Sequence, residues 1–260
     1  MGYENLLVDV SERIAMVTIN RPKSLNALNP ATVRELGAAM EELSARPDVG
    51  AVLLTGAGEK AFIAGADIFV MKGFTTLEAL DFSLLGQRVL AFMESMSQPV
   101  IGVINGFALG GGCELSLACT FRLASDNAKI GQPEVKLGII PGYGGSQRLP
   151  RLVGKGLAMQ MLLSGEHIPA AEAHRIGLVN EVVPQAELLP RAEAIAKKII
   201  ANAPLAVQYC MEAVHRGMEM SQAEGLYLEA TLFGLCCATD DKKEGTTAFL
   251  EKRAASFKGK

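Results

Sequence analysis

The stretch GFALGGGCEL, residues 106–115, sets three consecutive glycines almost directly before an acidic residue, Glu114. Glycine costs roughly 1 kcal/mol more than alanine inside a helix, so three in a row need a reason. An apolar run at 99–104, of strand length, precedes the stretch, and helix-forming residues follow it. These residues predict a buried strand, a tight turn and the first turn of a helix.

The glycines have two possible explanations. The first N–H groups of a helix point outward and carry the positive end of the helix dipole. Without side chains, a carbonyl oxygen could approach them closely, as in an anion or oxyanion site. Close packing of the helix on the sheet would explain the glycines equally well. This stretch alone leaves both readings open.

A second segment of small residues strengthens the functional reading. The sequence AFIAGADI, residues 61–68, follows another predicted strand and puts Ala66 and Asp67 at a predicted turn. Two backbone N–H groups from separate segments can grip one oxygen, and each such donor is worth about 2.7–4 kcal/mol where an oxyanion develops.

Two acidic residues lie in otherwise apolar surroundings. Glu114 is on the first helical turn, on the same face as Gly111, and Glu134 follows twenty residues later in GQPEVKLG. A pair of carboxylates beside an oxyanion site suits proton transfer to and from water. Taken singly, Glu114 also fits a favourable charge at a helix N-terminus, and Glu134 fits a surface loop.

Predicted strands and helices alternate up to about residue 185, and helices alone follow. The elements expected are a hairpin at 8–20, strands at 50–56, 99–104, 121–125, 129–131 and 178–183, and helices at 30–45, 76–96, 111–119, 155–164 and 170–175. Alternation predicts an α/β fold with a mostly parallel, covered sheet. We divide the chain into an α/β core, 1–190, and a C-terminal helical region, 191–260, whose apolar face packs on a neighbouring subunit.

Composition excludes several other classes of protein. The net charge of −3, the absence of Trp and an aromatic content of 5% argue against a nucleic-acid partner. We expect neither a signal peptide nor a membrane-spanning segment, and five cysteines without metal-type spacing predict reduced thiols in a cytoplasmic protein. The histidines lack metal-ligand spacing, so we expect no metal. TGAGEKA at 55–61 matches a dinucleotide motif only weakly, because a loop follows it where a helix is required.

Together these stretches resemble enoyl-CoA hydratases of the crotonase superfamily. The resemblance runs in order along residues 20–253 and rests on NRPKSLNALN, AFIAGADI, NGFALGGGCEL, GQPEVKLGIIPGYGGSQRLPRLVG, EAHRIGLVNEVVP and EGTTAFLEKR. It implies a spiral of ββα units with a C-terminal helical trimerisation region, assembled as a homotrimer or a dimer of trimers. It also implies a lyase of fatty-acid or other lipid metabolism.

The resemblance implies a role for each matching residue. The N–H groups of Ala66 and Gly111 would form an oxyanion hole for the carbonyl of a CoA thioester. Glu114 would act as base toward water and Glu134 as acid toward the α-carbon, and Gly142 would help to place the water. Substrate would also contact the run from Asp67 to Phe69 and Tyr143. No cofactor is implied beyond the CoA moiety of the substrate.

Two positions depart from the family pattern. Phe69 stands where many hydratases carry a polar residue, so this side chain cannot make the polar contact to CoA that such a residue would make. Tyr143, in PGYGG, is bulky near the expected acyl end and would limit chain length or add a hydroxyl. The acidic net charge leaves CoA binding to local groups, for which Lys23 and Lys60 are candidates.

The function expected is reversible hydration of a short- or medium-chain 2-enoyl-CoA. Alternatives on the same scaffold are an isomerase, which needs one carboxylate, a thioester hydrolase or a decarboxylase. A catalytically silent CoA- or RNA-binding member is the alternative from another class.

Overall fold

The computed structural model describes residues 2–260, and its strands form two sheets. The larger sheet has six strands in the order β1-β2-β3-β5-β7-β10, namely β1 (Leu6–Ser11), β2 (Ile14–Ile19), β3 (Ala51–Gly56), β5 (Val100–Ile104), β7 (Phe121–Ser125) and β10 (Glu181–Val183). β1 and β2 form the expected antiparallel hairpin, and every other neighbouring pair in this sheet is parallel.

The smaller sheet is built from very short strands. Its order is β4 (Ala61–Ile63), β6 (Phe107–Leu109), β8 (Lys129–Gly131) and β9 (His167–Pro169). Three times the chain passes from a strand of the larger sheet to a strand of the smaller sheet and then to a helix, starting at β3, at β5 and at β7. These successive ββα units confirm the predicted α/β architecture.

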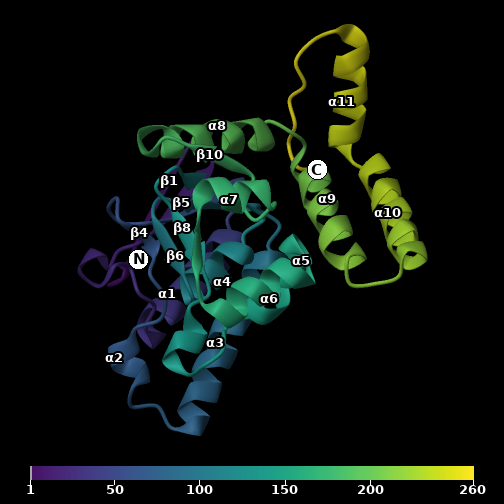
Figure 1. Cartoon of the computed structure of the whole chain (residues 1–260). Coiled ribbons are helices and arrows are strands. Elements are labelled where there is room, and N and C mark those ends of the chain that lie inside the picture. Colours follow the sequence, from purple (N-terminus) through teal and green to yellow (C-terminus); the bar gives the residue numbers. More distant parts are fainter. Residues whose placement is uncertain (1) are drawn as a thin grey trace.

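Helices cover both faces of the larger sheet (Figure 1). Alternate side chains of β3 face opposite ways, so Val52 and Leu54 join the main core with α1 (Pro30–Ser44) and α3 (Thr76–Ser95). Leu53 joins a second cluster beneath α8 (Leu188–Ile200). This two-sided burial explains why the strands read as continuous apolar runs.

The helix starts follow local capping chemistry. The Asn29 side chain accepts a hydrogen bond from Thr32 N at 2.8 Å, and Pro30 occupies the first turn of α1, as predicted. Thr75 and Glu78 form a reciprocal capping box at the start of α3. The N-terminus of α3 is therefore fixed beside the cavity described below.

Several short elements are not predicted by the sequence, and one strand is shorter than expected. β4, β6 and β9 are only three residues long, too short to show a periodicity. α5 (Gly145–Val153) contains Pro150, which removes a helical hydrogen bond and hides the helix in the sequence. The strand expected over 178–183 covers only Glu181–Val183. α6 (Lys155–Ser164) and α7 (Ala170–Arg175) lie where predicted.

The C-terminal helices form an arm beside the sheets (Figure 1). The arm comprises α9 (Pro204–Gly217), α10 (Gln222–Cys237) and α11 (Asp240–Glu251). The buried carboxylate of Asp241 accepts hydrogen bonds from Lys258 N and Gly259 N, which holds the chain end against α11. A boundary at 190/191 falls within α8, whose buried residues pack on the sheet, so the part that stands apart begins at α9.

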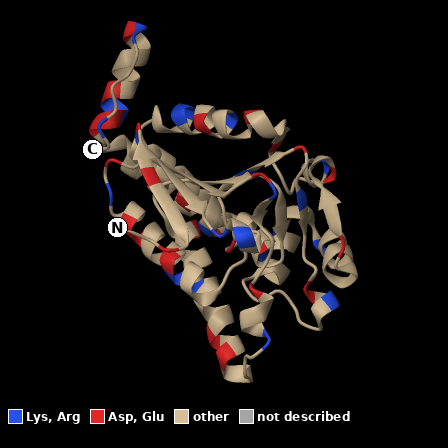
Figure 2. Cartoon of the chain, turned by 90° about the vertical axis from the view of Figure 1, so that its left-hand side faces the viewer, with Lys and Arg blue, Asp and Glu red and all other residues tan. Residues whose placement is uncertain are grey.

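Basic and acidic residues are interspersed along the ribbon in Figure 2. None of the helices in residues 2–260 combines the length and the apolar character that a membrane crossing requires.

Candidate active site

The three consecutive glycines precede and open α4 (Gly111–Leu117), and each is required for a different reason. Gly110 has a φ of +50°, and a Cβ there would lie 2.9 Å from Glu134 Oε1. A Cβ on Gly112 would lie 2.1 Å from the backbone oxygen of Ile63, so Gly112 is a packing glycine. A Cβ on Gly111 would meet only ordinary contacts at 3.6 Å, so packing does not explain Gly111.

Two backbone N–H groups are left free beside these glycines. Leu28 and Ala66 form an isolated parallel bridge, in which Leu28 N donates to Gly65 O and Asp67 N donates to Leu28 O, both at 2.8 Å. The N–H of Ala66 therefore turns away from Leu28. Within residues 2–260, neither Ala66 N nor Gly111 N, the first helical N–H of α4, donates to another protein group. Both residues line one cavity.

Glu114 is buried and rigidly held. Its side chain comes from the first turn of α4 and the residue is 2% exposed. Oε1 accepts hydrogen bonds from Tyr143 N and from Gly145 N, each at 2.7 Å. Burial raises the pKa of this carboxyl, and the two N–H groups and the charge of Arg148 oppose the rise by stabilising the ionised form.

Glu134 opens the short 3₁₀ helix η2 (Glu134–Leu137) and is 7% exposed. Burial raises its pKa to about 7, its own backbone N–H opposes that rise, and the charge of Glu114 adds to it. The side-chain amide of the fully buried Gln132 faces this carboxylate, and because a carboxylate only accepts, we assign the amide nitrogen to that side, where it donates to Oε1 at 2.9 Å and to Oε2 at 3.1 Å. A carboxyl with this pKa exchanges protons readily near neutral pH.

Both carboxylates and both free N–H groups line the same cavity, which has a volume of about 790 Å³. Its remaining wall is largely apolar, and the large side chains that contribute to it are Ile68, Met71, Phe74, Phe82, Leu137, Ile139 and Ile140. Phe82 packs edge-to-face on both Phe74 and Tyr143, with ring centroids 5.4 and 5.2 Å apart. An apolar cavity with a few converging polar groups is typical of a small-molecule site.

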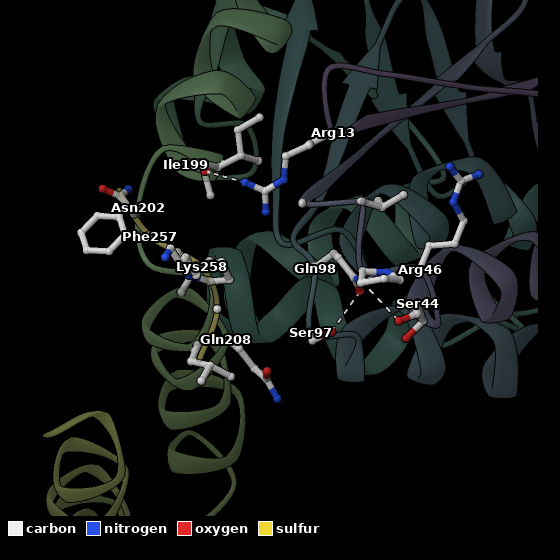
Figure 3. A pocket seen from close by; sticks show the side chains of 18 of the residues that line it. Arg13, Ser44, Arg46, Ser97, Gln98, Ile199, Asn202, Gln208, Phe257 and Lys258 are labelled. Carbon is white, nitrogen blue, oxygen red and sulfur yellow. Dashed lines mark hydrogen bonds between the residues drawn. The ribbon is translucent and has the colours of Figure 1, made fainter. Parts of the chain in front are cut away.

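A second cavity of about 470 Å³ lies between the core and the arm (Figure 3). Its wall includes Arg13, Arg46 and Lys258, and no Asp or Glu of residues 2–260 lines it. It therefore lacks the carboxylate pair. No three His, Cys, Asp or Glu side chains within the described chain cluster closely enough to hold a metal ion.

The structure brings most of the predicted site residues to the larger cavity, namely Ala66, Ile68, Gly111, Glu114, Glu134, Gly142 and Tyr143. It does not bring the others. Asp67 forms an ion pair with Arg21 at 3.0 Å, and Phe69 is 98% exposed. The cause is the phase of α2 (Ile68–Met71), which turns Ile68 and Met71 toward the cavity and Phe69 away from it. Lys23 and Lys60 are exposed and lie outside the cavity wall.

Sequence reasoning missed the residues that support the two carboxylates. Gln132 lies two positions before Glu134, and only its burial in the folded chain indicates that its amide supports the Glu134 carboxylate. Ser83 and Gln87 of α3 both donate to the carbonyl oxygen of Gly142; their spacing of four residues places both on one face of the helix but does not identify Gly142 as their partner.

Comparison with known proteins agrees with this geometry. The family model described as enoyl-CoA hydratase/isomerase matches residues 9–260. A protein of Syntrophomonas wolfei named crotonyl-CoA hydratase is 51% identical over 257 residues, covering 99% of each chain. A short-chain-enoyl-CoA hydratase of Clostridium acetobutylicum is 50% identical over 253 residues, covering 97% of each. The crystal structure of an enoyl-CoA hydratase from Bacillus anthracis superposes with a TM-score of 0.96 at 40% identity, covering 99% of this chain and 100% of that one. The chain has the crotonase fold and belongs to the enoyl-CoA hydratase/isomerase family.

Proposed function

We propose that this chain is an enoyl-CoA hydratase, a lyase that adds water reversibly across the double bond of a short- or medium-chain 2-enoyl-CoA. The observation that carries the proposal is the meeting of two buried carboxylates and two free backbone N–H groups in one apolar cavity. The names of the relatives at 51% and 50% identity support the same chemistry.

The N–H groups of Ala66 and Gly111 would bind the thioester carbonyl oxygen. Hydrogen bonds to that oxygen make the β-carbon electrophilic and stabilise the enolate that forms when water adds. Because the donors are main-chain groups held by the Leu28 bridge and by α4, they need no reorganisation as the charge develops.

The two carboxyls would divide the proton transfers. Glu114, anchored through Oε1, takes a proton at its other oxygen as the water oxygen bonds to the β-carbon. The electron pair of the double bond moves toward the thioester oxygen, and the protonated form of Glu134 delivers a proton to the α-carbon; with a pKa of about 7 this form is well populated at neutral pH. Proton exchange with solvent then returns Glu114 to its ionised form and Glu134 to its protonated form. Gly142 lines the cavity beside Glu114 and fits the role of placing the water.

The aromatic wall favours the shorter end of the proposed chain lengths. Tyr143 is almost fully buried, and its ring lies so close to Gly86 that a Cβ there would come within 2.2 Å of it. The ring therefore cannot move back toward α3 to make room for a longer acyl chain. The printed names of the two relatives, which refer to crotonyl-CoA and to short-chain substrates, point the same way.

Contacts to the CoA phosphates would come from outside the cavity, because none of its lining residues in the described chain is Lys or Arg. Lys23 and Lys60 stay predictions for this role. The absence of a cofactor, the absence of a nucleic-acid partner and the cytoplasmic location also stay predictions.

The direct test is the loss of conjugated-thioester ultraviolet absorbance when the protein is mixed with crotonyl-CoA, repeated with longer 2-enoyl esters. Rapid loss that weakens with chain length supports the proposal. An absorbance that stays constant with every ester, or turnover of a 3-enoyl-CoA alone, would favour the silent member or the isomerase. The presence of both carboxylates argues against the isomerase, which needs only one.

We also propose that the arm joins copies of the chain into a trimer or a dimer of trimers. α10 buries only Leu232, and the large apolar side chains exposed on the arm are Val214, Met218, Leu226, Tyr227, Phe233, Leu235, Phe249 and Leu250. So much exposed apolar surface marks an interaction face. Light scattering at micromolar concentration should give a multiple of three chain masses, and the monomer mass of 27.6 kDa would contradict the proposal.

A further inference from the structure

Both polar groups of the peptide bond between Gly142 and Tyr143 form hydrogen bonds with side chains. Its N–H donates to Glu114 Oε1 at 2.7 Å. Its carbonyl oxygen, on Gly142, accepts from Ser83 Oγ at 2.5 Å and from Gln87 Nε2 at 2.9 Å. Ser83 and Gln87 are one turn apart on α3, and Gln87 Nε2 also lies 3.3 Å from Ser83 Oγ. A single peptide unit thus connects α3 to the proposed base.

The next carbonyl of this loop is tied to the same helix through a side chain. Tyr143 O accepts from Arg148 Nη1 at 2.8 Å. Arg148 is in turn clamped by both oxygens of Glu94, at 2.7 and 2.6 Å, near the end of α3. Ser83, Gln87 and Glu94 are spaced by four and seven residues, so they project from one face of the helix.

The loop needs such external grips because its own backbone is permissive. Glycines occupy positions 138, 142, 144 and 145, and Gly138 and Gly144 have φ values of +75° and +102°. Fixing the backbone of glycine costs more conformational entropy than fixing any other residue. Hydrogen bonds to the Glu114 carboxylate alone would fix this loop only if the carboxylate were itself fixed by other contacts.

We propose that Ser83 and Gln87 are positioning residues that fix the Glu114 carboxylate by holding the Gly142–Tyr143 peptide. Their hydrogen bonds to Gly142 O aim the Tyr143 N–H at Oε1 and polarise the peptide, which makes that N–H a stronger donor. With Oε1 held by two N–H groups, the other oxygen is the one left for the water. Removing the grip lets the N–H drift, and Glu114 loses both its alignment and part of the stabilisation of its charge.

The inference rests on the proposed function, since it assigns Glu114 the role of base. The charged neighbour that acts on Glu114 is Arg148, and the charge of Glu114 in turn raises the pKa of Glu134, of the Tyr143 phenol and of the Cys113 thiol. None of these side chains is altered when Ser83 and Gln87 are replaced, so a change in the ionisation of Glu114 would report on the peptide.

The test is the double variant Ser83→Ala with Gln87→Leu, which removes both donors to Gly142 O. We expect kcat to fall by about 10- to 100-fold, as for a small misplacement of a reacting group. The ascending limb of the pH profile should move to higher pH, because a carboxylate that loses a hydrogen-bond donor has a higher pKa. Ser83→Thr, which keeps the hydroxyl, should retain the wild-type limb.

Two controls separate the possible outcomes. Ser95→Ala, on the same helix, removes only a local bond to Phe92 O and should change neither kcat nor the limb. If the double variant melts earlier and loses turnover while its ascending limb stays in place, the contacts serve only the fold and the inference is wrong. If the wild-type protein does not hydrate crotonyl-CoA, the proposed function fails; if Glu114→Gln keeps full turnover, Glu114 is not the base and the inference is wrong. An inactive Glu114→Gln beside a normal double variant overturns the inference alone.

Discussion

Glu114 and Glu134 line one cavity and are held by different parts of the structure. Glu114 lies on a helix and is fixed by two main-chain N–H groups from the 142–145 loop, both on one oxygen. Glu134 lies on a short 3₁₀ turn, and its carboxylate faces the side-chain amide of Gln132. Main-chain donors fix a position and stabilise the ionised form, whereas burial beside a second carboxylate favours the protonated form. We conclude that Glu114 is suited to act as base mainly by the position of its carboxylate, and Glu134 to act as acid mainly by its raised pKa.

The largest effect should come from removing the acid. Glu134→Gln keeps the size of the side chain and abolishes the proton donor, so we expect hydration of crotonyl-CoA to slow by about 10²–10⁴-fold. Binding of the CoA ester should survive, because the free N–H groups are untouched. Steady-state turnover together with a titration of a non-reacting CoA ester measures both. Retention of more than about a third of the wild-type turnover would mean that Glu134 is not the acid.

The glycines provide a matched pair for the other half of the comparison, the helix that carries Glu114. Gly111→Ala places a methyl group where only ordinary contacts surround it, so the fold should persist. The methyl would obstruct the carbonyl oxygen and cost up to the roughly 10²–10³-fold in turnover that loss of one donor causes.

Gly112→Ala is the control for this pair and should do the reverse. Its Cβ would lie 2.1 Å from Ile63 O, so the expected result is a fall in stability of about 1–3 kcal/mol with near-normal turnover in the protein that stays folded. Melting temperature and turnover are measured on the same preparations. A Gly111→Ala variant that is less stable but fully active would show that packing explains this glycine as well.

The sequence predicts those parts of this site that lie on continuous motifs. The free N–H groups and both acidic residues follow from GADI, LGGGCE and QPE, because each motif combines the reactive group with the backbone that presents it. The long strands and helices follow from periodicity. Three-residue strands escape because so short a segment has no measurable period.

The supporting residues escape for a tertiary reason. Gln87 and Gly142 are 55 residues apart, and nothing local marks them as partners. Phe69, for which a substrate contact is predicted, lies outside the cavity wall, because one residue of helical phase decides which side chain enters the cavity.

The raised pKa of Glu134 should also make the free energy of unfolding depend on pH. The pKa of Glu134 in the folded chain, about 7, exceeds the ordinary value of 4.5. A raised folded-state pKa means that its contribution to stability is present below pH 4.5 and is lost as the pH rises to 7. Glu134→Gln should therefore be more stable than the wild type at pH 8, by about 1–3 kcal/mol, and nearly equal to it at pH 4.5. Denaturant unfolding at the two pH values measures the difference, and a gain independent of pH would contradict the assignment.

The smallest effect concerns the amide that faces Glu134. Gln132→Leu removes a donor to the carboxylate, so the pKa of Glu134 should rise further, by about one unit or less. Because the acid must be protonated for hydration, the descending limb of the pH profile should move to higher pH while the ascending limb, which reports on Glu114, stays in place.

Gln98→Leu is a suitable control. Gln98 is also a buried glutamine, but its amide donates to the carbonyls of Leu43 and Ser44, beside the second cavity. That variant should lose stability and leave both limbs unchanged. If Gln132→Leu moves both limbs together, Glu114 and Glu134 do not depend on separate supporting contacts. The distinction between a base defined by its position and an acid defined by its pKa is then wrong.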